Sequence, residues 1–214
     1  MRFFILALLA APLFPQNWIS LFNGSDLTGW RQCNGQASYR VQDNTIVGTT
    51  AEGSPNSFLC TDRNYSDFIL EFEVLVDPKL NSGVQIRSHQ YPSDTEVVTG
   101  GQPRKHAAGR VYGYQVEIAT EATKASGGIY DEARRGWLDN PGCTSFKDSQ
   151  WNRYRVEARV DRIRTWVNGV ACANVTDSKD AEGFIALQVH SFKGDQPAQV
   201  RWRNLRIQIL ERSK

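Results

Sequence analysis

Alternation of apolar and polar residues is the dominant pattern of this chain. Residues 68–76 place Phe, Leu, Phe, Val and Val at every second position, and residues 154–160 alternate Tyr, Val, Ala and Val with Arg and Glu. A period of two puts the apolar side chains on one side of a β-strand. The same pattern predicts strands over residues 39–42, 45–47, 163–167, 184–190 and 200–210. In the last of these the alternation slips at Asn204-Leu205, which indicates a bulge.

Short turns separate these predicted strands. Asp43-Asn44 and Asn168-Gly169 have the chemistry of two-residue hairpin turns, and no helical periodicity of ten or more residues follows residue 16. We therefore predict an all-β fold of about ten or more short strands, packed as a two-sheet antiparallel β-sandwich of the jelly-roll kind. No composition shift divides residues 17–214, so one domain is expected. Two longer connections, residues 90–109 and 119–150, are predicted as loops, where function commonly lies.

Three of the predicted strands carry a pair of polar residues at positions i and i+2, which share one face of a strand. The pairs are Gln85 with Arg87, Gln115 with Glu117, and Gln188 with His190. A solvated outer face is one explanation, although three glutamines are unusual for such a face. Amides both donate and accept hydrogen bonds, which suits a hydroxyl-rich ligand. If the strands are neighbours, an acid, a second titratable group and a cation lie together, as proton transfer with oxyanion stabilisation requires.

Residues 126–138, with the sequence SGGIYDEARRGWL, form a second candidate for ligand binding. Tyr130 and Trp137 offer flat rings on which a sugar can stack. Asp131, Glu132, Arg134 and Arg135 are candidates for hydrogen bonds to sugar hydroxyls, or for ion pairs with one another. The alternative is a structural loop that is held by salt bridges among its own residues and by packing of Trp137.

The first sixteen residues are predicted to be a secretory signal peptide. Arg2 precedes the unbroken apolar run of residues 3–9, and small residues follow it. A short uncleaved anchor or a buried strand is the alternative. The run is shorter than the ~20 residues that span a bilayer, so no transmembrane segment is expected once the signal is removed. Export predicts a periplasmic or extracellular protein.

Export also bears on the four cysteines, Cys33, Cys60, Cys143 and Cys172, because disulfides persist in oxidising compartments. Four cysteines allow three pairings. We favour Cys33–Cys60 with Cys143–Cys172, since each pair closes a shorter loop, and four buried thiols are the alternative.

Charge and motif content exclude several functions. The net charge of +2 does not fit a dedicated nucleic-acid binder. The chain lacks HExxH, GxSxG, P-loop and GxGxxG motifs, and its three histidines are too scattered to predict a metal triad.

The order of several segments resembles the 3-keto-disaccharide hydrolase domain family of the concanavalin-like lectin/glucanase superfamily. These segments are LFNGSDLTGW (21–30), NSGVQIR (81–87), GYQVEI (113–118), GGIY (127–130), WN (151–152), WVNG (166–169), GFIALQVH (183–190) and RNL (203–205). The resemblance implies a concanavalin A-like sandwich, export, and action on oxidised carbohydrates. Two positions depart from the usual pattern: Ala119 replaces a frequent acidic residue, and Ser191 replaces a glycine.

The resulting hypothesis is hydrolysis of a 3-keto-glycoside or 3-keto-disaccharide by elimination and hydration. His190 is assigned as the base that removes the hydrogen at C2, and Arg87 as the group that stabilises the developing negative charge. Glu117 is assigned as the acid or as the residue that orients His190. The hydroxyl-binding residues are then Gln85, Gln115, Gln188 and Tyr130, with Asp131, Arg135 and Trp137 of the second motif.

No cofactor is predicted, although a divalent metal on Glu117 and His190 is an alternative to part of the role of Arg87. The competing classes are a non-catalytic, lectin-like carbohydrate-binding domain and a structural interaction domain. The expected partner is a carbohydrate or an oxidised glycoside, with no nucleic acid, and the sequence leaves the oligomeric state open.

Overall fold

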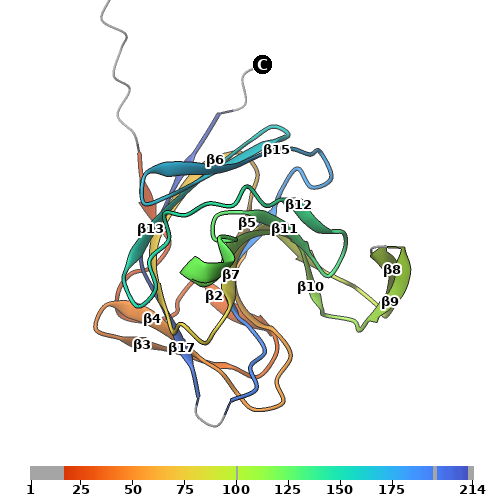
Figure 1. Ribbon diagram of the computed structural model, residues 1–214, viewed down its shortest axis with the longest axis horizontal. Coiled ribbons are helices and arrows are strands. Elements are labelled where there is room, and N and C mark those ends of the chain that lie inside the picture. Colours follow the sequence, from red (N-terminus) through yellow and green to blue (C-terminus); the bar gives the residue numbers. More distant parts are fainter. Residues whose placement is uncertain (1–16, 100, 195–196, 212–214) are drawn as a thin grey trace, which may run out of the picture.

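The computed structural model describes residues 17–99, 101–194 and 197–211, and the predicted signal peptide lies outside these ranges. Two antiparallel sheets pack face to face as a β-sandwich (Figure 1), so the predicted fold class is confirmed. In the described ranges the one helix is a single 3₁₀ turn, η1 (Glu121–Thr123).

The larger sheet, here called the back sheet, has eight strands. Its order is β15 (Val170–Thr176), β14 (Arg162–Val167), β13 (Asn152–Arg159), β6 (Phe68–Val76), β17 (Gln199–Ile209), β4 (Thr45–Thr49) and β3 (Ser38–Gln42), with β1 (Ile19–Ser20) paired to β17. The predicted hairpin turns connect β3 to β4 and β14 to β15. The predicted bulge is also confirmed, because the register of β17 shifts between Arg203 and Arg206.

The second sheet, here called the front sheet, has seven strands. Its order is β12 (Gly136–Asp139), β11 (Ile129–Glu132), β10 (Val111–Ile118), β7 (Ser82–Gln90), β16 (Gly183–Val189), β5 (Ser57–Tyr65) and β2 (Trp30–Asn34). The core fills the space between the sheets. Alternate residues of β6, such as Phe68 and Leu70, meet Val84 and Ile86 of β7, and all four are fully buried.

Both segments predicted as loops contain strands. Within residues 90–109, β8 (Thr95–Thr99) and β9 (Gln102–His106) form a hairpin that stands apart from the two sheets (Figure 1). Within residues 119–150, β11 and β12 extend the edge of the front sheet. Gly127 and Gly128 precede β11, and Arg134 and Arg135 lie at the turn between β11 and β12, where Ala133 and Gly136 have positive φ.

The favoured cysteine pairing is confirmed: Cys33 bonds Cys60, and Cys143 bonds Cys172. The first disulfide joins neighbouring strands β2 and β5, and the second ties the connection after β12 to β15. Two disulfides indicate an oxidising environment, typical of proteins outside the cytoplasm.

Removing the second disulfide should destabilise the protein without unfolding it. The bridge spans 29 residues, and a loop of this length restricts the unfolded chain by roughly 3–4 kcal/mol. We expect Cys143→Ala/Cys172→Ala to lower the free energy of unfolding by about that amount in urea titrations. The reference is the wild-type protein with both disulfides intact. Equal stability of the double variant and the oxidised protein would contradict the expectation.

Candidate functional site

The three strands that carry the predicted polar pairs are neighbours in the middle of the front sheet, in the order β10, β7, β16. Gln115 on β10 pairs with Gln85 on β7, and Glu117 pairs with Gly83, which in turn pairs with Gln188 on β16. Partners in register point to the same side of a sheet. The structure therefore brings the three glutamines and Glu117 together on the outer side of the front sheet.

The three glutamines hold one another. The amide nitrogens of Gln85 and Gln188 donate to Gln115 Oε1 over 2.7 and 2.8 Å, and Gln115 Nε2 donates to Glu117 Oε2 over 2.8 Å. Gln85 and Gln188 are fully buried, so the prediction that they bind substrate hydroxyls does not fit their position. They instead fix the amide of Gln115 with its nitrogen toward Glu117.

Glu117 lies at the base of a polar pocket of about 330 Å³. Asn81 Nδ2 donates to its second oxygen over 2.5 Å. Burial raises the pKa of Glu117 to about 7, against the hydrogen bonds from Asn81 and Gln115, which lower it. A carboxyl group with this pKa exchanges a proton near neutral pH, as a general acid or base requires.

His190 lines the same pocket, two residues after Gln188. Its Nδ1 lies 2.7 Å from the carbonyl oxygen of Ser191. Because a carbonyl oxygen only accepts, Nδ1 carries the proton in the neutral ring and Nε2 keeps its lone pair. Two strand spacings, about 10 Å, separate the backbones of β16 and β10, with β7 between them, and both His190 and Glu117 line the pocket.

Glu132, a candidate for hydroxyl binding that was not selected for the predicted site, forms a wall of the pocket. It forms an ion pair with Arg110, and it accepts a hydrogen bond of 3.2 Å from Asn56 Nδ2. Asn56 immediately precedes β5, four strands away from β11, a distance of about 19 Å across a flat sheet. The hydrogen bond therefore shows that the front sheet curls around the pocket.

Aromatic and basic residues line the pocket beside Glu132. Tyr130 and Trp137 contact edge to face with ring centroids 5.3 Å apart, and 45% of Trp137 is exposed. Arg104 and His106 come from β9, so the projecting hairpin supplies part of the pocket. His106 stacks on Tyr91, and its burial, together with nearby Arg110, lowers its pKa. Arg104 and His106 are the one arginine and the one histidine of residues 90–109, and their presence in a long connection was the available sequence signal.

Arg87 is a correction to the predicted site. It has a left-handed φ of 46°, which interrupts the alternation of β7, and its side chain is fully buried away from the pocket. Its guanidinium donates to Asp67 Oδ1 over 2.9 Å and to the carbonyl oxygens of Ser66 and Val160 over 2.6 and 2.7 Å. Arg87 thus joins β7 to two turns at one end of the sandwich.

Asp131 and Arg135 also lie away from the pocket. On β11, Tyr130 and Glu132 share the pocket face, so Asp131 between them points to the opposite side. Fully buried Asp131 forms ion pairs with Arg134 and Arg135, and Arg135 continues to Asp177 over 2.7 Å. The alternative interpretation of this motif, a segment held by its own salt bridges, fits these two residues, whereas Tyr130, Glu132 and Trp137 line the pocket.

Within residues 17–99, 101–194 and 197–211, no three His, Cys, Asp or Glu side chains cluster closely enough to hold a metal ion. No helix in those ranges has the length and apolar character needed to cross a membrane.

Comparisons with known proteins agree with this fold. A protein from Parabacteroides distasonis ATCC 8503, provisionally described as a glycosyl hydrolase, has 18% identity and a TM-score of 0.59, covering 91% of this chain and 94% of its own. A Bacillus subtilis protein of unknown function with a galectin-like fold has 11% identity and a TM-score of 0.60, with coverages of 90% and 94%. The carbohydrate binding module CBM66 of Bacillus subtilis has 16% identity and a TM-score of 0.52, with coverages of 84% and 95%. At such identities these likenesses support the lectin-like sandwich alone.

No curated protein matches the sequence. The family model of the 3-keto-alpha-glucoside-1,2-lyase-like domain matches residues 17–208, which is most of the chain. The chain therefore belongs to the 3-keto-alpha-glucoside-1,2-lyase-like domain family.

Proposed function

We propose that this protein is an exported enzyme that cleaves glycosides carrying a ketone at C3, by elimination followed by addition of water. The observation that carries the proposal is the pairing, in one polar pocket, of Glu117 with a pKa raised to about 7 and His190 with a free Nε2. The family name, which refers to a 3-keto-α-glucoside lyase, supports the substrate class. The two disulfides support export.

The reaction divides into proton transfers that these residues can perform. A C3 ketone acidifies the hydrogen at C2, and His190 Nε2 removes it as a proton. The electrons of the broken C2–H bond form a C1–C2 double bond as the C1–O bond breaks, and protonated Glu117 donates its proton to the departing oxygen. Water then adds across the double bond, its hydrogen at C2 and its hydroxyl at C1.

The negative charge that develops on the ketone oxygen needs a cation. Arg104 replaces Arg87 in this role, because Arg104 is exposed at the pocket and Arg87 is not. Tyr130 and Trp137 are positioned to stack on the sugar ring. A divalent metal on Glu117 and His190 is the alternative source of positive charge.

Sugar release tests the proposal directly. Purified protein is incubated with 3-keto-disaccharides and with their unoxidised parents, with and without chelator, and released sugar is measured by chromatography. We expect release from the keto substrates alone, and its loss in a folded His190→Ala variant. Chelator sensitivity would assign the charge stabilisation to a metal rather than to Arg104.

A non-catalytic, lectin-like function is the second candidate, favoured by the Tyr130–Trp137 pair beside the pocket. A binding domain needs these rings but does not need a carboxyl group titrating near neutrality beside a histidine. Retained glycan binding with no release from any substrate would establish this second function and overturn the first.

Gln115 is a positioning residue, and its substitution should move a pH profile. The amide nitrogen of Gln115 donates a hydrogen bond that stabilises the ionised form of Glu117. Methionine has a shape similar to that of glutamine but lacks this N–H donor. We expect Gln115→Met to raise the pKa of Glu117 and to shift the corresponding limb of the kcat profile to higher pH. A lower activity with an unshifted profile would contradict this role. Gln32→Met, an exposed amide on β2, is the matched control.

A further inference from the structure

The outer face of the back sheet concentrates positive charge on the side of the sandwich away from the pocket. The outward positions of β6, β13, β14 and β17 carry eight arginines and three glutamates, in a chain whose net charge is only +2. The arginines are Arg153, Arg155, Arg159, Arg162, Arg164, Arg201, Arg203 and Arg206, and the glutamates are Glu71, Glu73 and Glu157. An excess of five positive charges on one face predicts attraction of a polyanion.

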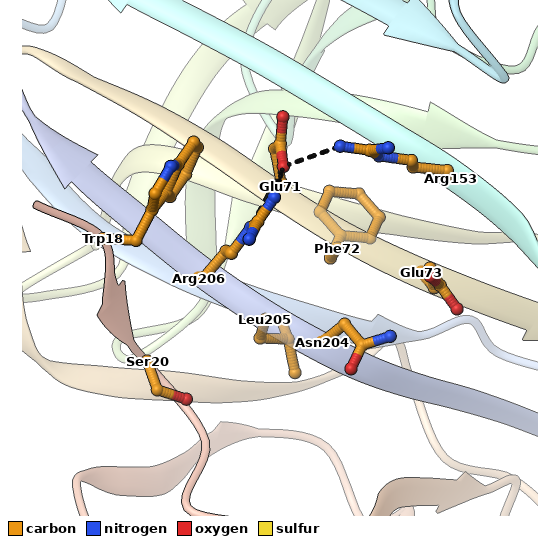
Figure 2. A pocket seen from close by; sticks show the side chains of 9 residues that line it. All are labelled: Trp18, Ser20, Glu71, Phe72, Glu73, Arg153, Asn204, Leu205 and Arg206. Carbon is orange, nitrogen blue, oxygen red and sulfur yellow. Dashed lines mark hydrogen bonds and ion pairs between the residues drawn. The ribbon is translucent and has the colours of Figure 1, made fainter. Parts of the chain in front are cut away.

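A hollow of about 450 Å³ opens in this face where the bulge of β17 interrupts the sheet. Figure 2 shows Trp18 beside Arg206, Glu71 in contact with both Arg206 and Arg153, and Phe72 and Leu205 among the other lining residues. An aromatic ring, an apolar floor and a few charged groups are the ordinary composition of a small-ligand site, and the volume is in the usual range.

A second hollow of about 530 Å³ adjoins the first. It shares Glu71 and Arg153 with it and is lined in addition by Arg155 and Trp166. Two hollows that share a wall, each with its own tryptophan, can hold successive units of one chain-like ligand.

The shared wall is cationic. Glu71 accepts hydrogen bonds of 3.0, 2.9 and 2.5 Å from Arg153, Arg155 and Arg206, so three guanidinium groups surround one carboxylate. Burial opposes ionisation of Glu71, yet these hydrogen bonds hold its pKa below the ordinary value. The wall therefore has an excess of two positive charges whose remaining N–H groups are available to an anion.

The tryptophans are each covered by arginine. Arg206 lies over Trp18 at 4.5 Å from the ring centroid, and Arg155 and Arg164 lie over Trp166 at 5.9 and 5.5 Å. Arginine forms such stacks and also binds carboxylate or sulfate through two parallel hydrogen bonds, which lysine does not. The outward positions of these four strands contain no lysine.

We propose that this face of the back sheet binds an acidic polysaccharide, whose sugar rings occupy the two hollows and whose carboxylate or sulfate groups contact the arginines around Glu71. The site is separate from the front-sheet pocket, so the proposal does not depend on the proposed reaction. A DNA duplex fits less well, because its bases are stacked inside the helix and cannot enter two separate hollows.

Binding of defined oligosaccharides tests the proposal. Calorimetric titrations at 0.15 M salt compare a galacturonate octamer, its fully methyl-esterified form, a heparin octamer and a DNA duplex. We expect the galacturonate or the heparin octamer to bind at least ~10 times more tightly than the neutral ester and the duplex, since both charge and rings contribute. The acidic octamer that binds more tightly identifies carboxylate or sulfate as the preferred group.

Substitutions locate the binding. Trp18→Ala and Trp166→Ala should each weaken binding of the acidic octamer about fivefold, because each removes a stacking ring. Arg206→Gln should weaken this binding by a similar factor. Arg40→Gln is the matched control, because Arg40 is an exposed arginine of the same sheet outside both hollows. His190→Ala should bind the octamer unchanged, which separates this site from the catalytic pocket.

Several outcomes would overturn the proposal. They are absence of binding by the wild-type protein, equal binding of the neutral ester or the duplex, and an equal loss in Arg40→Gln and Arg206→Gln. Unfolding temperatures of all variants show whether a loss of binding comes from a loss of fold.

Discussion

Glu117→Gln should abolish most of the cleavage of 3-keto substrates while leaving the protein folded. The amide has nearly the volume of the carboxyl group but transfers no proton, and general acid–base groups contribute about 10²–10⁴-fold to a rate. We expect kcat to fall within that range, measured as sugar release from saturating substrate. Glu121→Gln, on the exposed turn η1 and outside the lining of the pocket, is the matched control and should keep the wild-type rate. A Glu117→Gln protein with wild-type kcat would remove Glu117 from the mechanism.

The same variant should change how stability depends on pH. The pKa of Glu117 is raised from 4.5 to about 7 in the folded state, so between these values the folded protein holds a proton that the unfolded chain has released. This contribution to stability is complete below pH 4.5 and is lost as the pH rises through 7, by roughly 3 kcal/mol in total. Urea titrations from pH 4.5 to 8 should show this decline in the wild-type protein and a weaker one in Glu117→Gln. Parallel curves for the two proteins would show that the carboxyl group does not carry the raised pKa.

The strands of the two sheets could be predicted because each has one face in the core. In β6 and β13 the apolar residues at every second position pack against the opposite sheet. Burial of that face therefore produces an alternation that the sequence alone reveals. The hairpin of β8 and β9 could not be found in this way, because no residue of these two strands is buried in the core and an apolar face is therefore not required of them. Its absence from the prediction removed Arg104 and His106 from the candidate site.

The site residues that lie on regularly alternating strands were predicted. Those that depend on which face of a strand a residue takes were missed. Gln115, Glu117 and Gln188 follow from alternation within β10 and β16, once those strands are neighbours. In residues 129–132, by contrast, selecting Asp131 instead of Glu132 is an error of one position, and one position reverses the face of a strand. When a segment is interpreted as a loop, no alternation of faces is expected, so nothing indicates whether Asp131 or Glu132 faces the pocket.

Arg87 shows the limit of local patterns most clearly. Gln85 and Arg87 are two residues apart, so simple alternation places both side chains in the pocket. The left-handed residue at position 87 reverses the second of them, and the partners that stabilise this conformation lie in turns 20 and 73 residues away. Contacts at such separation leave no signal in the residues next to Arg87.

Arg87→Met should therefore act on stability and not on catalysis. The substitution leaves the buried carboxylate of Asp67 without the guanidinium at 2.9 Å, and breaking a buried ion pair costs about 3–5 kcal/mol. We expect urea titrations to show a loss of that size, with part of it restored in Asp67→Asn/Arg87→Met, because the second change removes the buried negative charge that the guanidinium balanced. Rates measured on the folded fraction should stay near the wild-type value, since Arg87 does not line the pocket. The catalytic role assigned from sequence demands the opposite result, in which kcat falls steeply while the free energy of unfolding is unchanged, and the two measurements together decide between these roles.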